Sequence, residues 1–191
     1  SRGLGDVYKR QVLDIGCSDG ELISYLENKG VSAQGVELNQ EKVIKCLEKG
    51  LDVIHGDINL IVEDFPFNQF DYCLLTQTIQ AVQKPDQLLN TLKKVSKNII
   101  VSFNNSARLS KISNFLLSGS FDSLLKKADS DHWYNTDYIH PCSIKDFKKL
   151  AANLDLKIIS TFDVINQRKF ENGKIPSNLF CKEVLFHITD E

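Results

Sequence analysis

Several features that mark membrane and metal-binding proteins are missing from this sequence. No apolar run approaches the roughly 18 to 20 residues that a membrane-spanning helix needs, and no signal peptide is recognisable. The five cysteines form no Cys-x-x-Cys pair and have no metal-ligand spacing with the four histidines. An odd, scattered set of cysteines favours reduced thiols in a cytoplasm. We therefore expect a cytoplasmic protein with no membrane partner and no metal site.

Basic charge is also scarce. The 23 lysine and arginine residues are outnumbered by 25 acidic residues, which leaves a formal net charge of -2. A nucleic-acid-binding surface needs a basic patch or stripe, but lysine pairs such as Lys93-Lys94 and Lys148-Lys149 fall where predicted helices expose their polar faces. We therefore expect no nucleic-acid partner.

Methionine is absent, so the chain has no initiator residue. The segment from Asp6 to Gln11 can be encoded by GAT GTG TAT AAG AGA CAG, which looks like a transposon adapter used in preparing sequencing libraries. We expect residues 1–11 to be translated adapter and the native chain to begin near Val12. Resequencing the source locus tests this expectation, and a genuine gene that encodes these residues would refute it.

The sequence does contain a regular alternation of strand and helix signals, typical of an α/β domain whose parallel sheet is covered on both faces. With 42% hydrophobic residues, the chain fits a single domain over residues 12–191. The predicted strands are residues 12–15, 33–38, 51–55, 71–76, 98–103, 156–162 and 179–188. Helices are predicted at residues 19–29, 40–49, 85–97 and 143–153, and residues 166–177 are predicted to be a connecting turn. Ser143 is predicted to cap the last of these helices, with Asp146 in the capping-box position.

Residues 104–141 interrupt this alternation. The segment contains a predicted short apolar helix around residues 109–117, followed by a polar stretch. Long irregular segments within a compact domain are often lids or binding loops. We therefore predict a lid or insert over residues 104–141.

The most informative motif follows the first predicted strand and reads Asp14-Ile15-Gly16-Cys17-Ser18-Asp19-Gly20. A strand, a glycine-bearing turn and a helix in this order form the place where α/β proteins bind nucleotide-like ligands. Gly16 and Gly20 allow the backbone to approach a ligand closely, and the helix offers free N–H groups to an anionic group. Glu37, at the end of the next strand, is predicted to accept hydrogen bonds from a ribose.

The charge of this turn indicates which nucleotide it suits. Its glycine spacing differs from the Gly-x-Gly-x-x-Gly of dinucleotide sites, and Asp14, Asp19 and Glu21 would repel a pyrophosphate. S-adenosylmethionine (SAM) has no phosphate, and it carries an ammonium, a sulfonium and only one carboxylate. We therefore expect SAM, or its product S-adenosylhomocysteine (SAH), and we disfavour an NAD-linked oxidoreductase.

The spacing Asp-x-Gly-x-x-x-Gly, with an acidic residue ending the second strand, resembles the class I SAM-dependent methyltransferases, which usually have a further glycine at the position of Ser18. His55-Gly56-Asp57-Ile58 matches the third strand end, where that family's acidic residue contacts adenine. The resemblance implies a Rossmann-like doubly wound sheet with strand order 3-2-1-4-5-7-6 and an antiparallel last strand. The cofactor-binding residues it implies are Asp14, Gly16, Cys17, Gly20, Glu37, Leu38, Asp57, Ile58 and Thr76.

A narrower resemblance, over residues 12–188, is to the MetW family of methionine biosynthesis. It rests on Leu75-Thr76-Gln77-Thr78-Ile79-Gln80-Ala81, Ile100-Val101-Ser102-Phe103, Trp133-Tyr134-Asn135-Thr136 and Ile139-His140-Pro141-Cys142. The resemblance implies a role beside a homoserine O-acyltransferase, without an established methyl acceptor. The chain departs from the family where Asn104-Asn105-Ser106-Ala107-Arg108 replaces a proline and an aromatic-rich segment.

The sequence identifies no catalytic residue, but five residues are candidates for contact with a substrate or partner. Gln77 and Gln80 are predicted to share one helical face, where a ligand contact and a structural role have equal weight. Trp133 and Tyr134 could stack on a ligand, anchor a partner or pack the lid. His140 could act as a general base, although a hydrogen-bonding scaffold is the commoner role for such a histidine.

Two functions therefore remain open. The first is a MetW-type accessory protein that binds SAM and associates with homoserine O-acyltransferase. The second is an active SAM-dependent methyltransferase acting on a small molecule, because methyl transfer can rely on proximity and orientation without a base.

Overall fold

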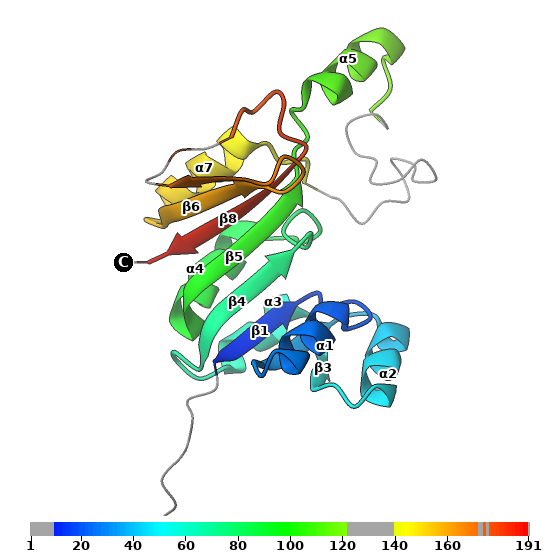
Figure 1. Ribbon diagram of the computed structural model, residues 1–191, viewed down its shortest axis with the longest axis vertical. Coiled ribbons are helices and arrows are strands. Elements are labelled where there is room, and N and C mark those ends of the chain that lie inside the picture. Colours follow the sequence, from blue (N-terminus) through cyan, green and yellow to red (C-terminus); the bar gives the residue numbers. More distant parts are fainter. Residues whose placement is uncertain (1–9, 122–139, 172–173, 175, 191) are drawn as a thin grey trace, which may run out of the picture.

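The computed structural model describes residues 10–121, 140–171, 174 and 176–190. This part of the chain forms one sheet of eight strands in the order β3-β2-β1-β4-β5-β8-β6-β7. Figure 1 shows β4, β5, β8 and β6 side by side in this sheet. The strands are β1 (Gln11–Ile15), β2 (Ser32–Glu37), β3 (Val53–His55), β4 (Phe70–Thr76), β5 (Ser96–Asn104), β6 (Lys157–Asp163), β7 (Arg168–Glu171) and β8 (Glu183–Thr189). The helices are α1 (Glu21–Asn28), α2 (Gln40–Glu48), α3 (Ile58–Ile61), α4 (Pro85–Val95), α5 (Leu109–Ser118) and α7 (Ile144–Asn153), with a 3-10 turn at Val62–Asp64.

The pairing of the strands confirms the predicted topology. Strands β1 to β5 pair in parallel, and β8 runs antiparallel between β5 and β6. Numbered as the sequence predicts them, these strands have the order 3-2-1-4-5-7-6. The sheet is therefore the Rossmann-like α/β sheet that the resemblance implies.

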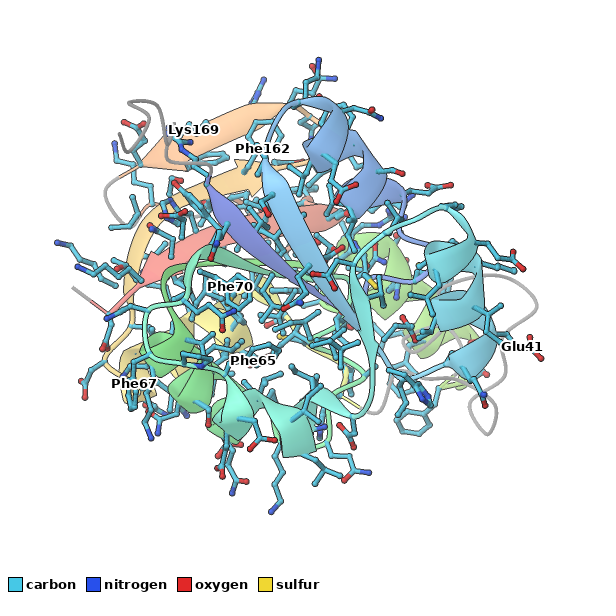
Figure 2. All side chains as sticks on the ribbon, turned by 90° about the horizontal axis from the view of Figure 1, so that it is seen from below. Glu41, Phe65, Phe67, Phe70, Phe162 and Lys169 are labelled. Carbon is cyan, nitrogen blue, oxygen red and sulfur yellow. The ribbon has the colours of Figure 1, made fainter. Side chains whose placement is uncertain are left out.

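Strand β7 is a correction, because residues 166–177 were expected to be only a connecting turn. It pairs antiparallel with β6 at the edge of the sheet, and Figure 2 labels Lys169 on this outer strand. Its sequence, Arg168-Lys169-Phe170-Glu171, is mostly exposed and charged. Charged residues are typical of edge strands, so the apolar alternation that identifies a strand in a sequence is absent here.

The helices cover both faces of the sheet. Neighbouring residues of a strand point to opposite faces, and Val12 and Leu13 of β1 accordingly belong to two separate apolar clusters. The cluster of Val12 includes Ile23 of α1 and Val43 of α2, whereas the cluster of Leu13 includes residues of α4 and α7. This arrangement is doubly wound, as predicted.

Helix α7 shows how a local signal places a core element. Ser143 and Asp146 form a capping box, in which the Ser143 hydroxyl accepts a hydrogen bond from the Asp146 N–H at 3.1 Å. The cap starts the helix so that Phe147 packs against Phe186 and Phe103, with ring centroids 4.6 and 5.3 Å away. These rings anchor β5 and β8 beneath the helix.

Helix α5 is the exception to this packing, because none of its residues is buried. It lies where a short apolar helix was predicted, and Figure 1 shows it projecting beyond the end of the sheet. Among the helices of the described residues, none has the length and apolar character needed to cross a bilayer.

Candidate functional site

The carboxyl ends of β1, β2, β3 and β4 meet at one edge of the sheet, which is where open α/β sheets bind ligands. The turn after β1 has positive φ angles at Gly16 (73°), Ser18 (52°) and Gly20 (73°). A Cβ atom at Gly16 would lie 2.7 Å from the Thr78 hydroxyl oxygen, and one at Gly20 would collide with buried side chains. Both glycines of the motif are therefore required by the shape of the turn.

Glu37 holds this turn in place. Its side chain is 8% exposed, and its Oε2 accepts a hydrogen bond from the Ser18 N–H at 2.9 Å. Its Oε1 accepts one from the Asn39 N–H at 2.8 Å. Each carboxylate oxygen has a second lone pair, so the residue predicted to contact a ribose can still do so while it anchors the backbone.

Asp14 is the most unusual ionisable group of the site. It is 1% exposed, and its Oδ1 has no hydrogen-bond partner among the described residues. Burial raises the pKa of Asp14 to about 7, a hydrogen bond with the Thr76 side chain opposes this rise, and the charge of Glu37 adds to it. The structure thus brings Asp14, Thr76 and Glu37 together, as the sequence predicted for a shared site.

Cys17 has a packing role in the turn. Burial, followed by the charge of Asp14, raises the pKa of the Cys17 thiol to about 12. A Cβ atom at Gly35 would lie 2.6 Å from the Cys17 sulfur, so the thiol fills the space that Gly35 leaves. A thiol that stays protonated is a poor nucleophile.

The remaining predicted cofactor residues lie at the ends of β2 and β3. Leu38 is 66% exposed, and its carbonyl lies 3.0 Å from Nε2 of His55. Asp57 caps α3, with its Oδ1 accepting from the Asn59 N–H at 2.9 Å. The Ile58 side chain belongs to the core cluster.

The predicted helical face shared by Gln77 and Gln80 is wrong, because residues 77–84 form turns and not a helix. Gln77 donates to Glu183 Oε1 at 2.6 Å and accepts from the Asn104 side chain at 2.9 Å. Gln80 donates instead to the carbonyl of His140, at 3.4 Å. The residues between the end of β4 and Pro85 are too few for a helix to propagate. Without a shared helical face, the two glutamines contact different partners.

His140 is held by this turn. Its N–H donates to the Gln80 carbonyl at 3.1 Å, and its ring Nε2 lies 3.1 Å from the Gln83 carbonyl. Because a carbonyl can only accept a hydrogen bond, Nε2 carries the hydrogen. These contacts are those of a hydrogen-bonding scaffold. Trp133 and Tyr134 lie outside the described residues.

The segment that departs from the family pattern has a structural role. The Asn105 side chain is 1% exposed and donates to the carbonyls of Asn178 and Cys181 at 2.7 and 2.9 Å. The Asn104 side chain donates a hydrogen bond to the Gln77 side-chain oxygen. The two asparagines therefore connect the end of β5 to the turn after β4 and to the loop before β8.

Three positioning residues were not identified from the sequence. The Thr78 hydroxyl donates to the Ile15 carbonyl at 2.9 Å, beneath Gly16. The Cys46 thiol donates to the Ser18 carbonyl at 3.3 Å, and the Lys49 ammonium donates to the Asp19 carbonyl at 2.6 Å. These contacts join residues 28 to 63 positions apart, so no local spacing reveals them.

A doubly wound sheet with a glycine turn after β1 and a buried carboxylate ending β2 defines a class I methyltransferase-like domain. Its fold is similar to a SAM-dependent methyltransferase from Archaeoglobus fulgidus, with a TM-score of 0.64 and 16% identity over 95% of this chain and 86% of the other. It is also similar to the plantazolicin methyltransferase BamL, solved with a triazolic desmethylPZN analog and SAH, with a TM-score of 0.67 and 12% identity over 95% and 77% of the two chains. At sequence identities this low, the structural similarity establishes the fold of this chain and not its reaction.

The family model described as methionine biosynthesis protein MetW matches residues 8–188, so the chain belongs to the MetW family. A curated relative, the bifunctional methionine biosynthesis protein MetXA/MetW of Rhodopirellula baltica (strain DSM 10527 / NCIMB 13988 / SH1), is 29% identical over 188 residues. The match covers 92% of this chain and 30% of that relative, so the chain spans less than a third of the relative's length.

Proposed function

We propose that this MetW-family protein binds SAM or SAH at the carboxyl ends of β1, β2 and β4. We also propose that it acts as an accessory partner of homoserine O-acyltransferase in methionine biosynthesis. The observation that carries the ligand proposal is the buried Asp14 carboxylate with an unpartnered Oδ1, beside a turn that requires glycine at two positions.

The residues of this edge match the chemistry of SAM. An unpartnered buried carboxylate oxygen suits the ammonium of the ligand, because a cation stabilises the ionised acid. Glu37 retains acceptor capacity for a ribose, and the exposed Leu38 supplies an apolar surface beside it. When bound, SAM supplies an electrophilic methyl group. The acidic side chains of the turn are unsuited to a ligand that presents phosphates.

The partner proposal rests on the bifunctional relative, whose printed name joins MetXA to MetW. Fusion keeps two units at a high effective concentration, which favours units that work together. We therefore propose that this chain associates with a homoserine O-acyltransferase.

The second candidate is methyl transfer to a small molecule, favoured by the fold shared with SAM-dependent methyltransferases. Of the candidate proton acceptors at the turn, the Cys17 thiol has a pKa of about 12 and stays protonated, whereas the buried Asp14 carboxyl has a pKa of about 7. Methyl transfer can proceed without a base, so the reaction products decide between the two functions.

The test mixes the protein with its cognate homoserine O-acyltransferase and follows acylation of homoserine and conversion of SAM in the same samples. We expect a stable complex at micromolar concentration, faster acylation and no formation of SAH. Steady SAM conversion on homoserine-pathway metabolites, with no complex by gel filtration, would reverse the ranking in favour of the methyltransferase.

The ligand half of the proposal is tested separately by calorimetric titration with SAM. Glu37→Ala should weaken binding by roughly 2 to 3 kcal/mol, because two charge-assisted acceptors are lost. Glu37→Gln is the matched control, because it retains one carbonyl acceptor and should keep part of the affinity. Parent affinity in Glu37→Ala would remove Glu37 from the site.

A further inference from the structure

Helix α5 presents large apolar side chains to solvent. Leu109, Leu116 and Leu117 are 47%, 75% and 87% exposed, and Phe121 just after the helix is 63% exposed. Leu116 and Leu117 follow Leu109 by seven and eight residues, and these spacings place the three leucines on one side of the helix. We call these four residues the α5 face. A contiguous apolar surface of this kind marks an interaction site more often than single exposed residues do.

A groove of about 520 Å³ lies at the base of the helix. Leu109 lines it from α5, Ile165 lines it from the turn after β6, and Leu179 and Phe180 line it from the loop before β8. The N–H of Leu109 donates to the Leu179 carbonyl at 2.7 Å, which fixes the start of α5 against that loop. Leu109 therefore belongs both to the α5 face and to the groove.

The charge of the groove indicates the chemistry of its partner. Arg108 and Lys182 line it, and none of the described residues that line it is acidic. A carboxylate from a partner would therefore meet complementary charge at Arg108 and Lys182.

We propose that the α5 face and its groove dock a protein surface that combines apolar side chains with carboxylates. This inference rests on the proposed function, under which that protein is the homoserine O-acyltransferase. A protein fits better than a metabolite, because a helix of ten residues is about 15 Å long and exposed leucines lie near both of its ends. Phe121 on the α5 face and Arg108 in the groove are of residue types that are enriched in protein interfaces.

The test measures the affinity of the acyltransferase for three variants by calorimetry. Leu117→Asp should weaken association at least about tenfold, and Arg108→Glu with Lys182→Glu should weaken it and reduce its dependence on salt. Phe67→Asp is the matched control, since Phe67 is 75% exposed and Figure 2 places it on the outside of the molecule. That variant should bind within about twofold of the parent.

The outcomes separate this inference from the proposed function. If the parent binds and Leu117→Asp binds equally well, the docking surface is wrong and the partnership stands. If the parent does not bind the acyltransferase, the partnership and this inference both fail. If Leu117→Asp lowers the melting temperature of the isolated chain by several degrees, or abolishes self-association, the α5 face is covered by this chain or by a second copy, and the inference is overturned.

Discussion

Ser18 adopts a left-handed backbone conformation in the middle of the turn after β1, with a φ of 52°. Methyltransferases of this class usually have glycine there. A non-glycine residue in this geometry costs about 1–2 kcal/mol, and this cost is tolerated because the Ser18 N–H bonds Glu37 and the Ser18 carbonyl accepts from Cys46. The turn is therefore strained at one position.

Ser18→Gly should raise the free energy of unfolding by about 1 kcal/mol, since glycine removes the strain and loses somewhat more backbone entropy on folding. Urea denaturation of parent and variant measures the difference. Ser24→Gly is the control, because Ser24 lies within α1, where glycine should lower stability by about 1 kcal/mol. A stability of Ser18→Gly at or below that of the parent would contradict strain at this turn.

Asp14 should make stability depend on pH. Burial, opposed by the Thr76 hydrogen bond, raises its pKa from 3.8 to about 7 in the folded protein. Between these values the folded state binds more protons than the unfolded state, so the contribution is fully present below about pH 4 and is lost as pH rises through 7. SAM affinity should rise over the same range, because an ammonium favours the ionised acid.

Urea midpoints measured from pH 5 to pH 8 test this prediction. Asp14→Asn should remove the decline in stability with rising pH. Asp163→Asn should leave the decline unchanged: burial raises the pKa of Asp163, but hydrogen bonds from Asn166 keep it below its ordinary value, so Asp163 stays ionised throughout this range. If the stability of the parent protein is constant over this range or rises with pH, ionisation of Asp14 does not destabilise the folded protein and the prediction is wrong.

Among the elements, α7 begins at a cap that the sequence predicts. Removal of the hydroxyl in Ser143→Ala should lower the free energy of unfolding by about 1 kcal/mol, because the Asp146 N–H loses its acceptor. Chemical denaturation measures the loss. Thr91→Ala is the control, since the Thr91 hydroxyl only bonds the Gln87 carbonyl within α4 and its removal should change stability by less than about 0.5 kcal/mol. Equal effects in the two variants would mean that the cap does not stabilise α7.

At the scale of the whole molecule, ligand and partner should be coupled reciprocally. If SAM changes the affinity for the acyltransferase by some factor, the acyltransferase must change the affinity for SAM by the same factor. Titrations of each ligand in the presence and absence of the other measure the two factors. Unequal factors would show that one of the titrations reports an additional process, such as self-association.

The sequence by itself determined the alternation of strands and helices, the glycine turn after β1 and the cap of α7, because each depends on a local pattern of apolar, glycine and capping residues. The strand order followed from the resemblance to class I methyltransferases. The sequence also placed Asp14, Glu37 and Thr76 at one edge, since the ends of parallel strands must meet there.

Only the tertiary structure decided how these residues are held. Glu37 anchors the backbone of Ser18, Thr78 supports Gly16, and Asn105 ties β5 to the loop before β8. It also showed that β7 is a strand and that α5 is not buried against the sheet. These outcomes depend on contacts between residues far apart in the chain and on which surfaces remain uncovered after folding, and neither leaves a periodic signal in the sequence.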